Sequence, residues 1–259
     1  MSGKLVVIGL GPGPAEHMTP EAARALAEAD ELFGYGPYID RAPLRDGQIR
    51  HPTDNREEAA RAAAALERAE AGAKVAMVTG GDPGVFAMAA AVVEQIEAGP
   101  ASWRTLDVEV IPGVTAMLAV AARSGAPLGH DFCAINLSDN LKPWPVVEAR
   151  VDAAAGAGFV MAFYNPRSKA RPWQLGAVLE RLRAILPPTT PVIFGRAACR
   201  PDEKITVFTL AEADAEVADM ATCVIVGSAE TRIVERPGLP PLVYSPRFFL
   251  PDLPAGRAR

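Results

Sequence analysis

The sequence predicts an α/β protein with two domains, and three observations support this class. Short runs of β-branched and other apolar residues alternate with alanine-rich helical segments through the first half of the chain. Glycine and proline follow the end of most of these runs, as is usual where a strand turns into a loop. In the second half the alternation is less regular, because two candidate strands have no helix between them. A parallel α/β domain is therefore expected first, followed by an α/β domain with a mixed sheet.

The first domain is expected to span residues 1–124. Thr19-Pro20-Glu21 is typical of a helix start, since threonine caps a helix and proline fits its first turn. Gly72 predicts the end of an alanine- and glutamate-rich helix. The expected strands are 5–9, 32–33, 75–79 and 108–111, and the expected helices are 22–29, 56–71, 86–98 and 115–124.

The second domain is expected at residues 125–234, after a linker at 125–129 that is rich in glycine. Residues 235–259 are rich in proline and predict an extended tail, not a further domain. The expected strands are 132–137, 159–164, 191–195, 205–209 and 223–226, and the expected helices are 145–154, 173–186 and 211–219.

The composition is that of a soluble globular protein, with 49% hydrophobic and 22% charged residues in a chain of 259. A net charge of −5 gives no general attraction to nucleic acid or anionic lipid. No apolar run approaches the roughly 18–20 residues that a bilayer span requires. Cys133, Cys199 and Cys223 are too far apart for a paired metal motif and favour reduced thiols. A cytoplasmic protein without a bound metal is expected.

Two glycine-rich segments follow expected strands and are candidate ligand loops. Gly9-Leu10-Gly11-Pro12-Gly13 is followed by Pro14, where a dinucleotide fingerprint needs glycine, and lacks the Lys-Ser/Thr ending of a phosphate loop. Gly80-Gly81-Asp82-Pro83-Gly84 places a carboxylate at the end of a strand, where open α/β sheets bind ligands. The structural alternatives are a tight turn for the first segment and a helix cap at Asp82 for the second.

These two segments, together with Pro112-Gly113-Val114-Thr115-Ala116, resemble the tetrapyrrole (corrin/porphyrin) methyltransferase family in order and spacing. The resemblance runs from about Lys4 to Arg232. Motifs of the second half narrow it to members that methylate precorrin-3B at ring carbon 17 and contract the macrocycle to precorrin-4 in cobalamin biosynthesis. Those motifs are Gly129-His130-Asp131-Phe132, Leu137-Ser138-Asp139, Pro143-Trp144, Tyr164-Asn165-Pro166-Arg167-Ser168 and Arg171-Pro172-Trp173-Gln174-Leu175.

The resemblance implies the two-domain tetrapyrrole-methylase architecture, with the active cleft between the domains. It also implies a homodimer, a small-molecule tetrapyrrole substrate, and S-adenosyl-L-methionine as the cofactor, which leaves as S-adenosyl-L-homocysteine. No nucleic acid or membrane partner is implied. Carried over residue by residue, the cofactor contacts fall on Leu10, Pro12, Gly80, Gly81, Asp82, Val85, Thr115, Ala116, Tyr164, Asn165, Ala198 and Thr222.

Proton transfer is the part of this chemistry for which the family pattern gives least guidance. Many relatives outside the subgroup have an acidic residue, proposed as a base, near the position of Tyr35, so that role does not carry over directly. His130-Asp131 stands where the linker enters the second domain, and Ser138-Asp139 follows the next strand. Both pairs are expected to face the cleft. Asp139 is the first candidate for an acid or base, followed by His130 and Tyr35. The structural alternatives are a turn at Asp139-Asn140 and a cap of the strand at His130-Asp131.

The proposed substrate carries many carboxylates, so an acidic protein must gather positive charge locally. Two clusters of cations flank the expected cofactor strands, and ordinary surface charge is the alternative for each residue. The clusters are Arg167, Lys169 and Arg171, and Arg196, Arg200 and Lys204. The substrate-binding candidates are Ser138, Arg167, Lys169, Arg171 and Arg200.

Other functions stay open at this point. A sister methyltransferase would act at a different ring carbon, or the same step would take a cobalt-loaded substrate. A protein that only carries a tetrapyrrole is the more distant alternative.

Overall fold

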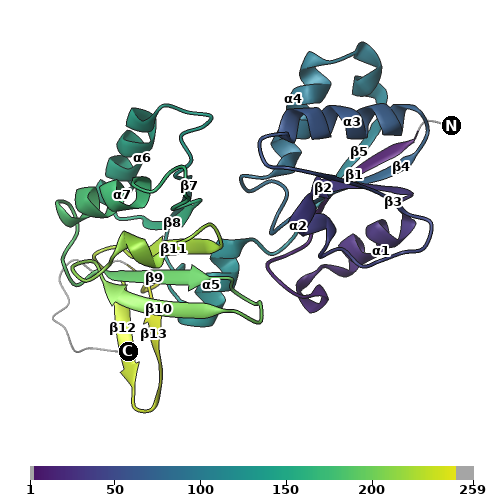
Figure 1. Cartoon of the computed structure of the whole chain (residues 1–259). Coiled ribbons are helices and arrows are strands. Elements are labelled where there is room, and N and C mark those ends of the chain that lie inside the picture. Colours follow the sequence, from purple (N-terminus) through teal and green to yellow (C-terminus); the bar gives the residue numbers. More distant parts are fainter. Residues whose placement is uncertain (1–2, 249–259) are drawn as a thin grey trace. The chain divides into compact units, whose positions relative to one another are not determined.

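The structure, a computed structural model, describes residues 3–248 (Figure 1). Contacts divide the chain into two compact units, Met1–Ala116 and Met117–Arg259. The helix that was expected to close the first domain at residue 124 therefore belongs almost entirely to the second unit. None of the helices within residues 3–248 combines the length and hydropathy that a bilayer span requires.

The first unit is built on a fully parallel five-stranded sheet in the order β3-β2-β4-β1-β5, which confirms the expected parallel α/β class. Its strands are β1 Lys4–Gly9, β2 Glu31–Tyr35, β3 Ile49–Thr53, β4 Lys74–Thr79 and β5 Asp107–Ile111. Its helices are α1 Pro20–Glu28, α2 Gly36–Ile39, α3 Glu58–Glu70 and α4 Met88–Ala98, with 3-10 turns at Ala15–His17 and Ala101–Thr105.

Alternating side chains of the buried strands give this sheet two apolar faces. Leu5 and Val7 of β1 pack in one core with α3 and α4, whereas Val6 and Ile8 pack in another with α1 and α2 (Figure 1). Both faces are covered, which explains why these strands are apolar runs without a polar side. The helix start expected at Thr19 is confirmed, since its hydroxyl accepts from the Ala22 amide at 3.1 Å.

The edge strand β3 was not predicted, because it is polar and contains Pro52. An edge strand tolerates proline, since one side of its backbone needs no partner. Buried Glu31 helps to fix this edge by accepting hydrogen bonds from Arg68 and, at 2.9 Å, from His51. The His51 ring also stacks on Phe33 with centroids 4.1 Å apart.

The second unit contains a five-stranded mixed sheet in the order β10-β9-β11-β8-β7, as expected. Strands β7 and β8 are parallel and the other neighbours are antiparallel. Its strands are β7 Phe132–Asn136, β8 Val160–Tyr164, β9 Pro191–Arg196, β10 Lys204–Thr209 and β11 Thr222–Val226, and its helices are α5 Ala116–Ser124, α6 Trp144–Gly156 and α7 Gln174–Arg183.

Helices cover both faces of this sheet too. Val151 of α6 and Leu179 of α7 share a core with Phe194 of β9. On the opposite face α5 approaches closely, because a Cβ on Gly195 would lie 2.1 Å from a methyl carbon of Val120. Gly195 is therefore required for helix–sheet packing.

Two sequence-based expectations for the second unit are wrong. The helix expected at 211–219 is only a 3-10 turn, Ala215–Val217, because extended Asp214 accepts from the Glu216 amide with its own side chain. The expected linker and tail also pair with each other. Strand β6 Gly125–Ala126 pairs with β13 Leu239–Tyr244, which pairs in turn with β12 Arg232–Arg236.

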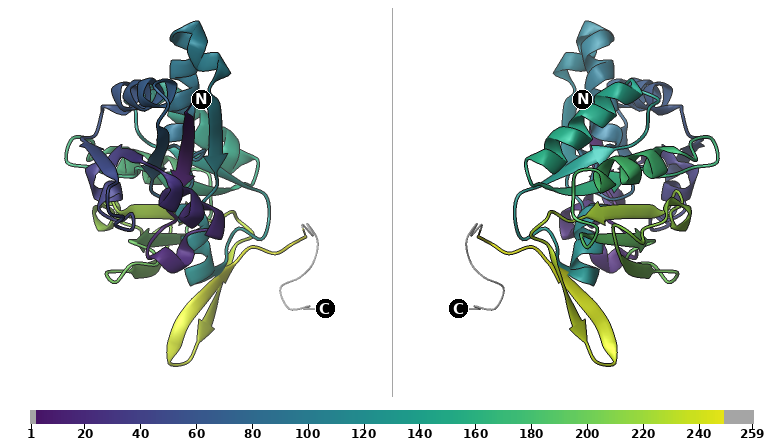
Figure 2. Two further views of the ribbon diagram at one scale, coloured as in Figure 1. Left: turned by 90° about the vertical axis from the view of Figure 1, so that its right-hand side faces the viewer. Right: turned by 90° about the vertical axis from the view of Figure 1, so that its left-hand side faces the viewer.

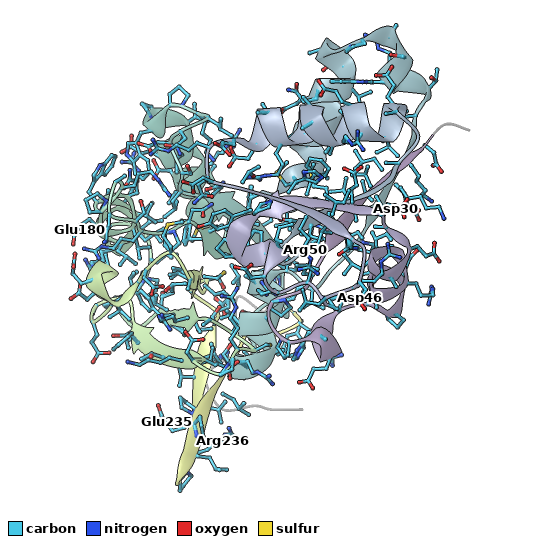
Figure 3. The ribbon with its side chains drawn as sticks, turned by 45° about the vertical axis from the view of Figure 1, so that its right-hand side comes forward. Asp30, Asp46, Arg50, Glu180, Glu235 and Arg236 are labelled. Atoms are coloured by element: carbon cyan, nitrogen blue, oxygen red, sulfur yellow. The ribbon has the colours of Figure 1, made fainter. Side chains whose placement is uncertain are left out.

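The β12–β13 hairpin extends from the second unit in Figure 2, and Figure 3 labels Glu235 and Arg236 on it. Arg236 closes its turn by donating from Nε to the Pro240 carbonyl at 2.9 Å. Prolines 240 and 241 are tolerated because β6 pairs only with Val243 and Tyr244. Residues 249–259 of the expected tail lie outside the described residues.

Candidate active site

The connections that leave β1 and β4 run in opposite directions across the first sheet. The chain passes from β1 over β4 to reach β2, and later from β4 over β1 to reach β5. Because β1 and β4 are neighbours, their carboxyl ends flank the point at which the strand order reverses. Open α/β sheets bind ligands at this point. The two glycine-rich segments, residues 9–13 and 80–84, follow these two strands.

Glycines allow three loops to meet at this edge of the first sheet. Gly81 and Gly11 exchange backbone hydrogen bonds of 2.9 and 3.2 Å. A Cβ on Gly9 would lie 2.6 Å from the Gly81 carbonyl oxygen, and a Cβ on Gly113 would lie 2.3 Å from the same atom. The glycines of the three loops that follow β1, β4 and β5 are thus needed because one backbone lies directly against another.

The Asp82 carboxylate joins two of these loops. Its Oδ1 accepts from the Gly84 amide at 2.8 Å, and its Oδ2 accepts from the Gly113 amide at 3.0 Å. Asp82 does not cap the following helix, because α4 begins six residues later at Met88, after Ala87. Each carboxylate oxygen keeps a lone pair, so the part-exposed group can still accept from a ligand hydroxyl or ammonium group.

Two residues that brace these loops were missed in the sequence. Arg41 donates from Nη2 to the carbonyls of Gly11 and Gly13 at 2.9 and 3.1 Å. The Tyr38 ring lies against Gly80, where a Cβ would be 2.8 Å from a ring carbon. Both belong to the region of α2, whose Gly-Pro start resembles a loop, although proline at a first helical turn is the signal that could have revealed it.

Tyr35 lies at the carboxyl end of β2, on the same edge of the sheet. Its ring meets that of Tyr38 edge-on, with centroids 5.5 Å apart and an interplanar angle of 84°. Tyr38 in turn lies against Gly80. The structure therefore brings Tyr35 close to one proposed cofactor loop, and its role in proton transfer stays a prediction.

The remaining first-unit candidates lie in or beside the same loops. Leu10 is a core side chain, 1% exposed, so only its backbone is available to a ligand. Pro12 and Thr115 are buried, and Val85 and Ala116 are half-buried. The structure brings these candidates to one edge, and their contacts with a cofactor stay predictions.

A buried arginine at this edge was also missed. Arg61 of α3 donates to the Thr53 hydroxyl, to the Asp54 carbonyl at 2.7 Å and to the Met88 sulfur at 3.3 Å. Burial lowers the pKa of its guanidinium. Arg61 thereby ties the end of β3 to the start of α4. In the sequence it cannot be told from an ordinary surface residue of a charged helix.

The carboxyl ends of β7, β8 and β9 lie at one edge of the second sheet. These three strands share a direction, because β11 is antiparallel to both β8 and β9, and β7 is parallel to β8. The amino ends of β10 and β11 lie at the same edge. Most candidates of the second half are therefore brought together there: Ser138, Asp139, Tyr164, Asn165, Ala198 and Thr222.

Hydrogen bonds fix the candidate cofactor residues of this edge. The Tyr164 hydroxyl oxygen accepts from the Met117 amide at 3.0 Å, at the first turn of α5. Asn165 has a left-handed backbone with φ 51°, and its amide donates to the Asn136 side-chain oxygen at 3.1 Å. Thr222 is buried and donates from its hydroxyl to Asp219 at 2.7 Å.

The loop around Ala198 holds unusual backbone angles. Ala197 and Cys199 both have positive φ values, 48° and 67°, which residues other than glycine rarely adopt. Arg200 closes the turn by donating its amide to the Ala197 carbonyl at 2.9 Å. Such strain is found most often at functional sites.

Asp139 and Gln174 form a pair at the same edge. The Gln174 amide nitrogen lies 3.3 Å from each oxygen of the Asp139 carboxylate. Gln174 is the first residue of α7 and is 1% exposed, whereas Asp139 is half-buried. No pattern in the sequence connects these two residues, which lie 35 positions apart.

His130 does not join this group. It precedes β7, where the carbonyl of neighbouring Asp131 accepts from the Val160 amide at 3.0 Å, whereas Ser138 and Asp139 follow the same strand. The full length of β7 separates the two pairs. The structure therefore does not bring the two pairs together, because residues at opposite ends of one strand lie at opposite edges of the sheet. The role of His130 in proton transfer stays a prediction.

In each of the two clusters of cations, one arginine is already paired with carboxylates of this chain. Arg167 donates from Nη2 to both oxygens of Glu216 at 2.6 Å, and Arg196 pairs with Asp202 and Asp219 at 2.7 and 2.8 Å. These ion pairs neutralise much of both charges.

Arg171 keeps its charge more fully. It donates to the Asn165 carbonyl at 3.2 Å, and this neutral acceptor does not cancel the charge. Lys169 is exposed and Arg200 is half-buried.

Within residues 3–248, no three His, Cys, Asp or Glu side chains gather as a metal site would require.

Comparison with known proteins identifies the family. Residues 4–214 match the model of the Tetrapyrrole (Corrin/Porphyrin) Methylases. The chain belongs to this family. This tetrapyrrole methylase is 67% identical in sequence to the Precorrin-3B C(17)-methyltransferase of Sinorhizobium sp, over 96% of this chain and 98% of that protein. It is 41% identical to the Probable cobalt-factor III C(17)-methyltransferase of Salmonella typhimurium, over 95% of this chain and 99% of that protein.

Solved structures of tetrapyrrole methylases agree with this assignment. The methyltransferase CobJ matches with a TM-score of 0.90 and 52% identity, over 95% of this chain and 100% of that one. Uroporphyrin-III C-methyltransferase from Thermus thermophilus, solved with S-adenyl homocysteine, matches with a TM-score of 0.64 and 23% identity, over 88% and 98%. The second match shows the shared fold alone. The resemblance seen in the motifs is thus confirmed, together with the fold class.

Proposed function

We propose that this tetrapyrrole methylase is an S-adenosylmethionine-dependent precorrin-3B C(17)-methyltransferase of cobalamin biosynthesis. It methylates ring carbon 17 of precorrin-3B as the macrocycle contracts, and it releases precorrin-4 and S-adenosylhomocysteine. The observation that carries the proposal is the 67% identity, over nearly the whole of both chains, to the Sinorhizobium enzyme. The lower identity to the cobalt-factor III enzyme favours the metal-free substrate.

The loops at the reversal point of the first sheet fit the cofactor. Small residues leave room beside Asp82, and its carboxylate retains lone pairs for ribose hydroxyls or for the ammonium group. We assign cofactor contacts here to Leu10, Pro12, Gly80, Gly81, Asp82, Val85, Thr115 and Ala116. At the edge of the second sheet we assign them to Tyr164, Asn165, Ala198 and Thr222.

The protein's own contribution is alignment, charge and proton transfer. When bound, S-adenosylmethionine supplies an activated methyl group, so the enzyme needs to orient the acceptor carbon and exclude water. Asp139 holds and moves the proton of a macrocycle oxygen during contraction. Arg171, with Lys169 and Arg200, attracts the carboxylates of the substrate. Ser138 contacts the substrate beside Asp139.

We further propose that the enzyme is a cytoplasmic homodimer. The acidic net charge and the absence of a spanning helix within residues 3–248 are compatible with this. Sedimentation of the purified protein would give the oligomeric state, and a monomer at micromolar concentration would contradict the dimer.

The decisive experiment is a single reaction with two substrates in parallel. The purified protein is incubated with methyl-labelled S-adenosylmethionine and either precorrin-3B or its cobalt-loaded counterpart. Mass spectrometry of the product, with carbon NMR to locate the label, should show one methyl group at carbon 17 and a contracted ring from the metal-free substrate. A label at another ring carbon would identify a sister enzyme, and faster turnover of the cobalt form would reverse the choice of substrate. Binding without transfer would overturn the enzymatic proposal.

A further inference from the structure

We infer that Gln174 is the positioning residue of Asp139, and that its amide serves both protonation states of that carboxyl group. The inference rests on the proposed function in one respect, since it takes Asp139 as the group that moves a proton. The geometry of the pair carries it: a buried amide is aimed at a carboxylate at the edge of the second sheet.

Gln174 has the fixed attachment that a positioning residue needs. It is the first residue of α7, and its neighbour Leu175 is fully buried in the core that α7 shares with the sheet. Asp139, by contrast, lies in a segment without regular structure after β7. The carboxylate therefore depends on side-chain contacts for its orientation, and the amide of Gln174 supplies them from a rigid helix.

The environment of the oxygen at the other side of the Gln174 amide is unusual. The Gln174 side-chain oxygen is buried, and it has no hydrogen-bond partner among the described residues. Rotating the amide by 180° would place this oxygen against the carboxylate, where two acceptors would repel each other. The orientation with the nitrogen toward Asp139 is therefore the one that suits the charged carboxylate, and it leaves the oxygen without a donor.

A buried acceptor without a donor lowers stability, so its presence in a native protein calls for an explanation. If Gln174 only filled space, methionine or leucine would fill the same volume without this cost. A glutamine amide has a property that these side chains lack, because it presents a donor on one side and an acceptor on the other.

This property matches the needs of a group that takes up and releases a proton. While Asp139 is charged, the amide nitrogen donates to it. Once Asp139 carries a proton, its hydroxyl becomes a donor, and rotation of the amide lets the Gln174 oxygen accept it. Lysine or arginine at position 174 would support only the charged state. Glutamine therefore keeps the carboxyl group oriented on both sides of the proton transfer.

The test is a double-mutant cycle of Gln174→Met and Asp139→Asn in the full-length protein, with S-adenosylmethionine and precorrin-3B. Gln174→Met keeps the volume and removes both hydrogen-bonding groups. We expect its Tm to stay equal or rise, and cofactor Kd and precorrin KM to change by less than about threefold, while kcat falls by roughly tenfold or more. Gln95→Met, at a half-buried glutamine of α4, is the matched control and should leave kcat unchanged.

In the cycle, Gln174→Met should slow the Asp139→Asn protein little further, because its target is already lost. A wild-type kcat in Gln174→Met, or effects that multiply fully in the double variant, would overturn the inference. A wild-type enzyme that does not methylate precorrin-3B would overturn the proposed function instead. The two failures are therefore distinguishable.

Discussion

The functional edges of the two sheets are built in different ways. At the first edge, backbones lie directly against one another. Gly9 and Gly113 are glycines because a Cβ would collide with a carbonyl or amide, and Gly81 because its backbone is left-handed, with φ 68°. At the second edge, side chains such as Asn165, Tyr164 and Gln174 hold the loops by hydrogen bonds. Backbone packing at the first edge gives a surface against which a small ligand can bind. The side chains at the second edge supply groups that can take part in the reaction. Substitutions of the first edge's glycines should therefore lower stability and weaken cofactor binding, whereas substitutions of the second edge's polar side chains should act mainly on the precorrin substrate and its turnover.

The largest effect is expected from Asp139→Asn. This change keeps the size of the side chain and removes its charge, so formation of the contracted product should fall by roughly a hundredfold or more. The affinity for S-adenosylmethionine, measured by calorimetry, should change little. Nearly unchanged turnover would assign Asp139 a structural role and turn attention to Tyr35.

Gly113→Ala should have the largest effect on the first edge. Its new Cβ would lie 2.3 Å from the Gly81 oxygen, so the loops must move apart. We expect a loss of about 3 kcal/mol in the free energy of unfolding, and weaker cofactor binding. Denaturant titration measures the first quantity. Gly156→Ala is the control, since a Cβ there has nothing within 4 Å, and equal losses in both variants would contradict the packing argument.

Asp82→Ala should separate binding from turnover. Its carboxylate joins the Gly84 and Gly113 amides and is available to the cofactor. Loss of the charged hydrogen bond from the carboxylate to the cofactor should weaken S-adenosylmethionine binding by roughly 1–3 kcal/mol, with a smaller effect on kcat at saturation. Calorimetry that finds the wild-type affinity would remove Asp82 from the cofactor site.

Arg171 and Arg167 offer a comparison within the second edge. Arg167 is paired with Glu216 and Arg171 binds a neutral carbonyl, so Arg171→Ala should raise the KM for precorrin several-fold, and Arg167→Ala less. The salt dependence of kcat/KM should weaken in the Arg171 variant, since one attracting charge is gone. Equal salt dependence in the wild type and both variants would leave them as ordinary surface cations.

The smallest effect is expected far from both edges, at Glu31. The hydrogen bonds from Arg68, and then those from His51, hold the pKa of this buried carboxyl below its ordinary value of 4.5. The stability that this gives is present above pH 4.5 and is lost as the pH falls through the lower pKa of the folded state. Glu31→Gln should cost roughly 1 kcal/mol at pH 7 and make unfolding less sensitive to acid. An acid transition identical to that of the wild type would contradict this.

The sequence allowed prediction of the elements whose patterns are local. Buried strands such as β1 and β4 are continuous apolar runs, and the start of α1 carries its own cap at Thr19. Edge strand β3 was missed because its polar residues are stabilised by contacts from elsewhere, among them the hydrogen bond between His51 and Glu31. The helix expected at 211–219 failed because Asp214 prefers its own local hydrogen bond.

The same distinction applies to the candidate site. The glycine loops were found because close approach of backbones restricts the sequence to glycine. Gln174, Arg41 and Arg61 were not found, because their function depends on partners that no local pattern marks. The Gln174–Asp139, Arg41–Gly11 and Arg61–Met88 contacts join residues 35, 30 and 27 positions apart. No periodicity or spacing encodes such a contact.

The pairing of β6 with β13 also has a consequence for the order in which the protein folds. Residues 125 and 126 leave the ribosome early, whereas their partners Val243 and Tyr244 follow only after all strands of the mixed sheet have been synthesised. The mixed sheet can thus assemble on a nascent chain whose three-stranded sheet is still incomplete. Contacts of such long sequence separation form slowly, because a large loop must close first. Completion of the second unit is therefore a late event in folding, and until then the edge of β6 is open to the wrong partner.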